Sequence, residues 1–467
     1  MRFVANFLML AALIPAAEPS RQQVLDERRA RFGPLVRIEE LAQAVPPELG
    51  AYAELRLAES PKLSDKRYRL ELVEDAFHKA SHGSRKVPVK AVAMQGMEGT
   101  QAAVTAQAAK LGLDALSLQS RAVSDLAAID PRRARMFFEM IIVPAPAKMS
   151  CQDALVEDYS VYYAAAERVA RQLKGDDAMR FVNDLLSRIG SASQLAGAIR
   201  FLTPQSMAVF GAALQRVEGD DRSFTASLQE VKAAMNAMAP GNPVLIAAYR
   251  QYLVRNLHAT RCAESLDLDW NVENARQAVA EFQRYAGDMA IPEDDVKAEG
   301  KGESAKTERI LDPQFASAQR AKFQALMFGS ANRALGPQMK SGSDWQQSFG
   351  ETLSEVSGMK PAPGQSEAVF FYAKGGSLQA LLLAAPAGPE RDRVLAQYLE
   401  FLQNSNFQND HPAEWFAPVE SLLGMARSME PQERAKLLES MERSGHPTLA
   451  LFAALEQHLE TRPDWAR

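Results

Sequence analysis

Residues 175–190 read GDDAMRFVNDLLSRIG, and this stretch decides the fold class. Its apolar residues recur at the spacing of one face of an α-helix, namely Ala178, Phe181, Val182, Leu185 and Ile189. Gly190 follows as a helix stop, because glycine readily adopts the left-handed conformation that ends many helices. The stretch therefore predicts an amphipathic helix whose apolar face must be covered by neighbouring helices.

The same helical periodicity recurs along most of the chain, and proline residues mark where many of the periodic runs begin. Proline suits the first helical turn, because its missing N–H is not needed there. Apolar-periodic runs begin at Pro131, Pro204, Pro243, Pro313, Pro412, Pro431 and Pro447. About one residue in six is alanine, the strongest helix former. We predict an all-α fold of about sixteen helices in an irregular array of antiparallel pairs, either α-solenoid-like or an α/α toroid. Only residues 87–94 resemble a strand.

The composition is that of a globular protein without a basic nucleic-acid-binding surface. The chain of 467 residues has 53 Lys and Arg against 58 Asp and Glu, which gives a net charge of −5. Hydrophobic residues make up 47% and charged residues 24%, so a large buried core is available. The acidic balance argues against nucleic acid as a partner.

The N-terminus has the features of a short secretory signal peptide. Arg2 supplies a positive charge, residues 3–14 are apolar except for Asn6, and Ala16 and Ala17 offer a cleavage site. We expect cleavage near Ala17 and a periplasmic or secreted mature protein with no membrane span. No asparagine begins an Asn-x-Ser/Thr acceptor, which favours a periplasm.

The two cysteines, Cys151 and Cys262, are predicted to form one disulfide, because export delivers the pair to an oxidising compartment. Two inert buried thiols are the alternative. The bridge would close a loop of 110 intervening residues, which stabilises a fold by about 4 to 5 kcal/mol in the chain-entropy model. Its role would be structural, since the Cys-x-x-Cys spacing typical of redox sites is missing.

The clearest domain boundary lies in a charged segment near the middle of the chain. Ten of the seventeen residues in 293–309 are charged, and no apolar face is present. We predict a signal peptide at 1–17, an N-terminal helical domain at 18–290, a solvated linker at 291–312 and a C-terminal helical domain at 313–467. A proline-alanine segment at 143–147 marks a lesser break.

The sharpest metal hypothesis concerns Glu74, His78 and His82. Their spacing of four places them on one face of a helix, where imidazole and carboxylate groups could hold a zinc-like ion. A simple polar helix face is the better explanation, since His82 beside Gly83 suits the negative end of a helix dipole and no third ligand from another helix is in view. We therefore predict no metal or other cofactor and keep these residues as weak candidates.

Three further patterns are incomplete matches to known sites. Asp267, Asp269, Asn271 and Glu273 alternate like calcium ligands, but the loop glycine and the final glutamate are missing. Residues 300–307 differ from a phosphate-binding loop by Ala305. Ser357 and Lys360 have the spacing of a penicillin-binding enzyme, without its other motifs. Helix caps and chance explain all three.

No motif defines a reaction, so the functional hypothesis rests on architecture. We expect an exported, non-catalytic helical-array protein that binds another protein or a cell-envelope polymer. The alternative is a secreted helical-toroid enzyme that acts on carbohydrate or a similar polymer with a pair of acids. The two differ in a testable way, because the enzyme needs a deep pocket where carboxylates with perturbed pKa values converge. Tyr159, Tyr162 and Tyr163 are expected in the core.

Overall fold

The fold is known from a computed structural model. It describes residues 33–91, 100–147, 153–217, 221–257, 268–292, 342–361, 367–405 and 407–460, with the single residues Ala30 and Pro363. The predicted signal peptide, both cysteines and the segment 293–309 lie outside these ranges.

The described part of the chain is almost entirely helical, as predicted, with more α-helices than the sixteen expected. The first group comprises α2 (Pro34–Ala42), α3 (Pro47–Ala58), α4 (Lys66–Ala80), α5 (Gln101–Ala109), α6 (Ala115–Ile129), α7 (Pro131–Met140) and α8 (Ser160–Ala170). The second comprises α9 (Gly175–Ser187), α10 (Ala192–Ala198), α11 (Met207–Arg216), α12 (Asp221–Met238), α13 (Pro243–Leu257) and α14 (Leu268–Ala286). Short 3₁₀ turns, η1 (Ile199–Phe201) and η2 (Gly287–Met289), follow α10 and α14.

The C-terminal group of helices comprises α17 (Gly342–Ser357), α18 (Glu367–Ala384), α19 (Pro389–Gln403), α20 (Phe407–Asp410), α21 (Pro412–Ser428), α22 (Pro431–Arg443) and α23 (Pro447–Glu460). The strands in the described ranges are β1 (Val89–Ala91) and β2 (Leu155–Glu157), which pair antiparallel with Lys90 opposite Val156. The sequence indicated the first strand but not its partner.

Proline opens five of the helices where the sequence predicts it, namely those that begin at Pro131, Pro243, Pro412, Pro431 and Pro447. The prediction for Pro204 was wrong by three residues, because α11 begins at Met207. The Ser206 hydroxyl accepts a hydrogen bond from the Thr203 N–H at 2.9 Å and forms a turn before the helix. Gly175, with φ of 54°, begins α9, as expected for the stretch 175–190.

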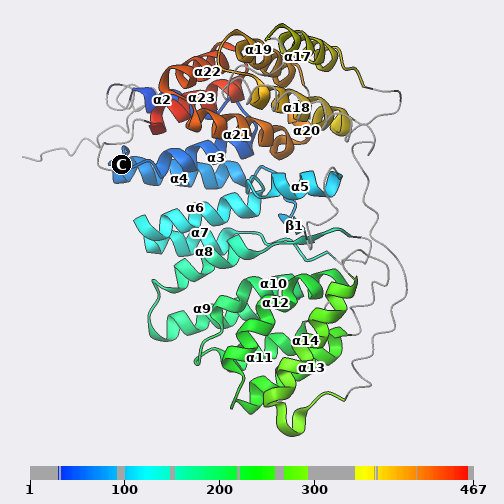
Figure 1. Ribbon diagram of the computed structural model, residues 1–467. Helices are drawn as coiled ribbons and strands as arrows, with labels where there is room; N and C mark the ends of the chain where they lie inside the picture. Colours follow the sequence, from blue (N-terminus) through cyan, green and yellow to red (C-terminus); the bar gives the residue numbers. More distant parts are fainter. Residues whose placement is uncertain are drawn as a thin grey trace, which may run out of the picture.

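The helices form an open stack (Figure 1), in which α17 and α19 lie at the top and α11 and α13 at the bottom. Going down, α4, α6, α8, α10, α12 and α14 pack one on the next. The C-terminal helices extend the stack in the other direction, because α23 packs against α2 and α3. The first helices of the chain therefore lie in the middle of the array.

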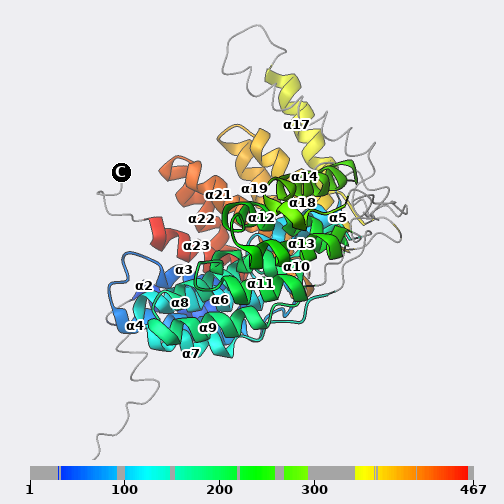
Figure 2. The ribbon, with the colours of Figure 1, turned by 90° about the horizontal axis from the view of Figure 1, so that it is seen from below.

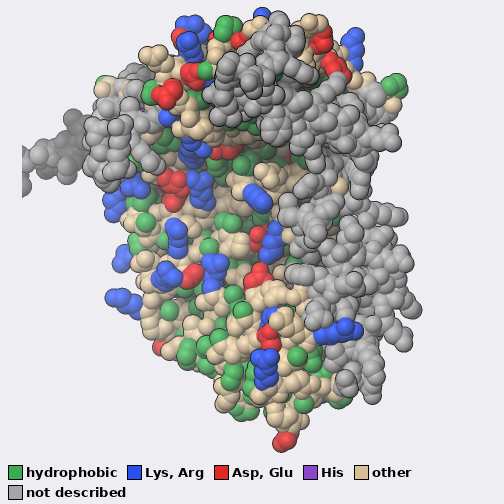
Figure 3. Space-filling view, in the orientation of Figure 1, with side chains coloured by type: hydrophobic (Ala, Val, Ile, Leu, Met, Phe, Trp, Pro, Cys, Tyr) green, Lys and Arg blue, Asp and Glu red, His purple; other side chains and the backbone are tan. Residues whose placement is uncertain are grey.

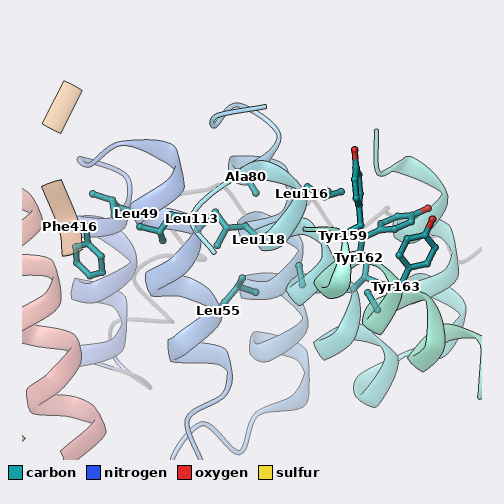
Figure 4. Packing of buried hydrophobic residues seen from close by; sticks show 14 of the residues in the cluster. Leu49, Leu55, Ala80, Leu113, Leu116, Leu118, Tyr159, Tyr162, Tyr163 and Phe416 are labelled. Atoms are coloured by element: carbon teal, nitrogen blue, oxygen red, sulfur yellow. The ribbon is translucent and has the colours of Figure 1, made fainter. Parts of the chain in front are cut away.

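A single hydrophobic core runs through the stack. Figure 4 shows part of it, from Phe416 of α21 through Leu49 and Leu55 of α3 to Leu118 of α6 and the tyrosines at the start of α8. The predicted N-terminal and C-terminal domains thus share buried side chains. The boundary between them stays a prediction about residues 291–312, of which the structure describes only the first two.

Helix packing in two parts of the chain, between α12 and α14 and in the C-terminal group, has a shared spacing that the sequence does not display. Cross-helix hydrogen bonds repeatedly join side chains 40 to 45 residues apart, which is one helix pair with its connections. The pairs between α12 and α14 are Gln229–Asn274, Lys232–Gln277 and Asn236–Glu281. The pairs in the C-terminal group are Gln379–Ser421, Arg391–Glu433 and Gln408–Thr448. The array therefore grows by helix pairs in both parts of the chain.

Candidate functional site

The strongest candidate site is a groove of about 680 Å³ between α7, α8 and α9. We call it the aromatic groove. Its walls are α7, the extended residues 141–147 that follow α7, and α9. The start of α8 forms its floor. Figure 2 shows α7, α8 and α9 together at the lower edge of the view.

The wall after α7 is fixed by local sequence. Pro131 opens α7, and the Asp130 carboxylate accepts hydrogen bonds from two N–H groups of the first turn. Pro144 and Pro146 prevent the helix from continuing. The extended segment is held by the Ala147 N–H, which donates to the Glu157 carboxylate at 3.0 Å. The proline-alanine segment that the sequence marked as a break is therefore one side of the groove.

The floor of the aromatic groove is a set of contacting rings. The Phe138 ring stacks on Tyr162 with 5.1 Å between centroids and lies 5.4 Å from the Phe181 ring. Tyr163 packs edge-on against Tyr162. Burial raises the pKa of Tyr162 to about 12, so its phenol stays neutral near pH 7 and can donate a hydrogen bond. Rings from three successive helices thus form one apolar surface.

A glycine allows α10 to approach this floor closely. A Cβ atom at Gly197 would lie 2.6 Å from a ring carbon of Tyr163 and 3.3 Å from the Tyr159 carbonyl oxygen. No side chain fits at such distances without movement of the ring. Gly197 therefore supports the position of Tyr163 from behind the groove.

The rim of the groove is charged, with a small positive excess. Arg135, Arg180 and Arg188 line it together with Glu139 and Asp184. The ion pairs of these arginines lie within single helices, at 3.1 Å for Arg135–Glu139, 2.8 Å for Arg180–Asp177 and 2.6 Å for Arg188–Asp184. Such exposed pairs are weak and easily exchanged for others. Figure 3 shows Lys and Arg side chains outnumbering Asp and Glu over the left of this face, where α4 to α9 lie.

Exposed large hydrophobic side chains gather on the same elements. The described residues include seven such side chains, and five of them belong to α7, α8, α9 or the extended wall. They are Met136, Met140, Ile142, Val161 and Met179. Ile142, between two lining residues, is 75% exposed. None of the five lines the groove itself; they lie on the elements that form it.

A second cavity, of about 760 Å³, lies between α19 and α22. Its floor is aliphatic, with Leu395, Leu399 and Leu437. Its two sides are joined by a hydrogen bond from Arg391 of α19 to Glu433 of α22 at 3.2 Å. No aromatic residue is among the described residues that line this cavity, so we take the aromatic groove as the better candidate for a binding surface.

The structure does not assemble the hypothetical metal site. The Glu74 carboxylate forms an ion pair with Arg133 of α7, and the His78 ring packs against Phe77 and Phe137. His82 lies beyond the end of α4. Within the described ranges, no group of three or more His, Cys, Asp or Glu is placed to hold a metal ion. Packing and ion pairing account for Glu74 and His78.

The other sequence patterns have structural roles or lie outside the description. Asp269, Asn271 and Glu273 are within α14 instead of a calcium-binding loop. The Ser357 hydroxyl, at the end of α17, donates to the Leu353 carbonyl at 2.6 Å. Lys374, not Lys360, reaches this helix end and donates to the Ser357 carbonyl at 2.8 Å. Residues 300–307, Cys151 and Cys262 lie outside the described ranges, so the disulfide stays a prediction.

The fold and groove define an all-α helical array with a groove lined by aromatic rings. Comparison of the chain with protein family models, curated proteins and solved structures finds no match. Among the described helices, none combines the length and apolar character needed to cross a membrane.

Sequence reasoning identified the groove only in part. It expected Tyr162 and Tyr163 in the core, and both are buried. It missed that Phe138 and Phe181 join them, because the four residues span more than forty positions and three helices. The proline-alanine segment that forms one wall was visible in the sequence, but only as a break between helices.

Proposed function

We propose that this protein is a non-catalytic, exported helical-array protein that binds an extended segment of another protein in the aromatic groove. The observation that carries the proposal is a groove whose lining combines four aromatic rings, Phe138, Tyr162, Tyr163 and Phe181, with an extended proline-containing wall and a rim of arginines. Aromatic floors bind extended peptides because flat rings give large contact areas at little entropic cost.

The charge of the rim favours a particular kind of segment. Three arginines and two acids line the groove, although the whole chain has a net charge of −5. A complementary segment has apolar or proline side chains for the ring floor and at least one carboxylate beside them for Arg180 or Arg188. Guanidinium groups bind carboxylates through paired hydrogen bonds, so such a flank gives orientation as well as affinity.

The location of the perturbed carboxylates supports binding over catalysis. Burial raises the pKa values of Glu54 and Asp125 to about 7, which is the behaviour expected of a general acid. Neither residue lines the aromatic groove or the cavity between α19 and α22. The groove acids Glu139 and Asp184 instead pair with arginines of their own helices.

The test is selection of peptides from a random dodecamer display library on the full-length protein. We expect recovered peptides to share apolar or proline residues beside Asp or Glu and to bind in the micromolar range. Reversal of the rim charge in Arg180→Glu should weaken their binding at least tenfold, because the acidic flank then meets a carboxylate. Fluorescence anisotropy with a labelled peptide measures the change.

Arg171→Glu is the matched control. Arg171 is an exposed arginine in an i,i+4 ion pair, as Arg188 is, but it follows α8 and does not line the groove. Equal loss of binding in Arg171→Glu and Arg180→Glu would show a general charge effect and contradict the proposal. The proposal would also be contradicted if the selection recovered no peptide and an envelope polysaccharide bound the wild-type chain but did not bind Arg180→Glu.

A further inference from the structure

One wall of the aromatic groove leaves its main chain without hydrogen bonds. The N–H and C=O groups of residues 142–146 make no hydrogen bond to any residue that the structure describes. The chain is held just before this stretch, where the Ile141 N–H donates to the Phe138 carbonyl at 3.1 Å. It is held again just after, where the Ala147 N–H donates to the Glu157 carboxylate at 3.0 Å. The wall between these two bonds therefore offers free main-chain donors and acceptors.

The two prolines of this wall decide which of its edges can pair with another chain. In an extended chain, the N–H and C=O groups of alternate residues point to the same edge. Pro144 and Pro146 have no N–H, so the edge that they share with Ile142 has a donor only at Ile142. The opposite edge has the N–H groups of Val143 and Ala145. Main-chain pairing with two successive donors is therefore possible along one edge only.

The edge with the two free donors faces the floor of the groove. Ala147 belongs to the same edge, and its N–H is directed at Glu157. The other carboxylate oxygen of Glu157 accepts from the hydroxyl of Tyr159 at 3.0 Å, directly before α8, whose start forms the floor. Val143 and Ala145 themselves line the groove. A chain that lies in the groove thus meets the free donors of these two residues.

We infer that the partner segment binds as an added β-strand along this wall, through main-chain hydrogen bonds with Val143 and Ala145. This binding mode presupposes the proposed function and specifies which segments the groove accepts. Main-chain hydrogen bonds give an added strand affinity, and contacts of its alternate side chains give specificity. Because paired strands lie about 4.8 Å apart, the added strand occupies the space between the wall and α9, over the ring floor.

The pairing defines the class of partner more narrowly than the composition of the groove does. The partner has apolar side chains at every second position, because alternate side chains of a strand point to the same face. The two partner residues whose N–H groups bond to the wall cannot be proline, since proline has no N–H to donate. Proline is accepted at the positions between and beyond them. The carboxylate of the partner lies toward Arg180 or Arg188, on the side of α9.

The test is an amide-to-ester scan of a peptide from the display selection. Each ester removes one main-chain N–H of the peptide and leaves the side chains in place. Competition against the labelled parent peptide on the full-length protein, followed by fluorescence anisotropy, measures the affinities. We expect two sensitive positions, separated by one tolerant position, at which the ester weakens binding about fivefold through loss of one hydrogen bond.

Ala145→Pro removes one donor from the wall itself, and Ile142→Pro is the matched control. The N–H of Ile142 belongs to the opposite edge, and its side chain does not line the groove. Ile141, with φ of −67° and ψ of 120°, already has the extended conformation that a following proline requires. Ala145→Pro should weaken peptide binding about fivefold and Ile142→Pro less than about twofold. Circular dichroism verifies that both variants are folded.

Strand pairing is wrong if every ester is tolerated, or if Ala145→Pro binds the peptide like Ile142→Pro. Arg180→Glu separates this failure from failure of the proposed function. A peptide that tolerates every ester but loses affinity for Arg180→Glu binds in the groove without strand pairing, so that only the pairing is contradicted. Unchanged affinity for Arg180→Glu, or recovery of no peptide, contradicts both.

Discussion

Replacing Glu456 with glutamine should lower the free energy of unfolding by about 3 kcal/mol. The carboxylate is 4% exposed and binds Arg56 and Arg427, so the glutamine variant leaves two arginines facing a neutral side chain in a mostly buried place. Removing one partner of a buried ion pair costs more than the pair itself contributes, because the remaining charge stays desolvated. Urea denaturation followed by circular dichroism at 222 nm measures the change.

Glu439→Gln is the matched control for this prediction. Glu439 also pairs with an arginine, Arg443 at 2.5 Å, but both side chains are exposed and lie on one helix. Its replacement should change the free energy of unfolding by less than about 0.5 kcal/mol. Similar effects of the two substitutions would contradict the structural role assigned to Glu456 at the junction of α3, α21 and α23.

The second large effect is on the pH dependence of stability and concerns Glu54. Burial raises the pKa of this fully buried carboxyl from 4.5 to about 7, although Lys79 beside it acts in the opposite direction. The native protein therefore holds this proton more tightly than the unfolded chain does. The stability that the protonated carboxyl contributes is present below pH 4.5 and is lost as pH rises through about 7, by about 3 kcal/mol in total.

Glu54→Gln should remove this loss, because glutamine is a neutral group of the same shape that does not titrate. Between pH 4.5 and 8, the free energy of unfolding of the variant should rise by about 3 kcal/mol relative to that of the wild type. Asp125, whose pKa is also raised to about 7, is present in both proteins and cancels in the difference. Urea denaturation at several pH values gives the comparison, and parallel curves for wild type and variant would refute it.

The sequence predicts individual helices well because their signals are local. Pro131, Pro243 and Pro412 each open a helix where a missing N–H has no cost. The error in the start of one helix is also local in origin. At Pro204, the Ser206 hydroxyl forms a turn with Thr203 and delays the helix, an alternative that periodicity does not reveal.

The order of helices in the stack could not be predicted, because it depends on long-range packing. Most neighbours in the array are close in sequence, but α23 packs against α2 and α3 and so places these two helices in the middle. No apolar pattern in α23 distinguishes α3 as its partner from any other helix. The ion pairs of Glu456 with Arg56 and Arg427 follow from this contact, so the sequence carried no signal for them.

The hypothetical metal site illustrates the opposite error, in which helical spacing suggests a function that packing removes. Glu74 and His78 lie one turn apart, as predicted, but α7 packs beside them. Its Arg133 pairs with Glu74, and its Phe137 contacts the His78 ring at 5.6 Å between centroids. Spacing on one helix identifies a shared face, and the neighbouring helix decides what that face contacts.

Amide hydrogen exchange of the full-length protein, with and without a peptide from the display selection, tests the proposed function most directly. The account predicts slower exchange in residues 135–147, 160–163 and 175–188, which form the walls and floor of the aromatic groove. Exchange in α19 and α22, beside the other large cavity, should be unchanged. Protection in α19 and α22 with none around the aromatic groove would contradict the account.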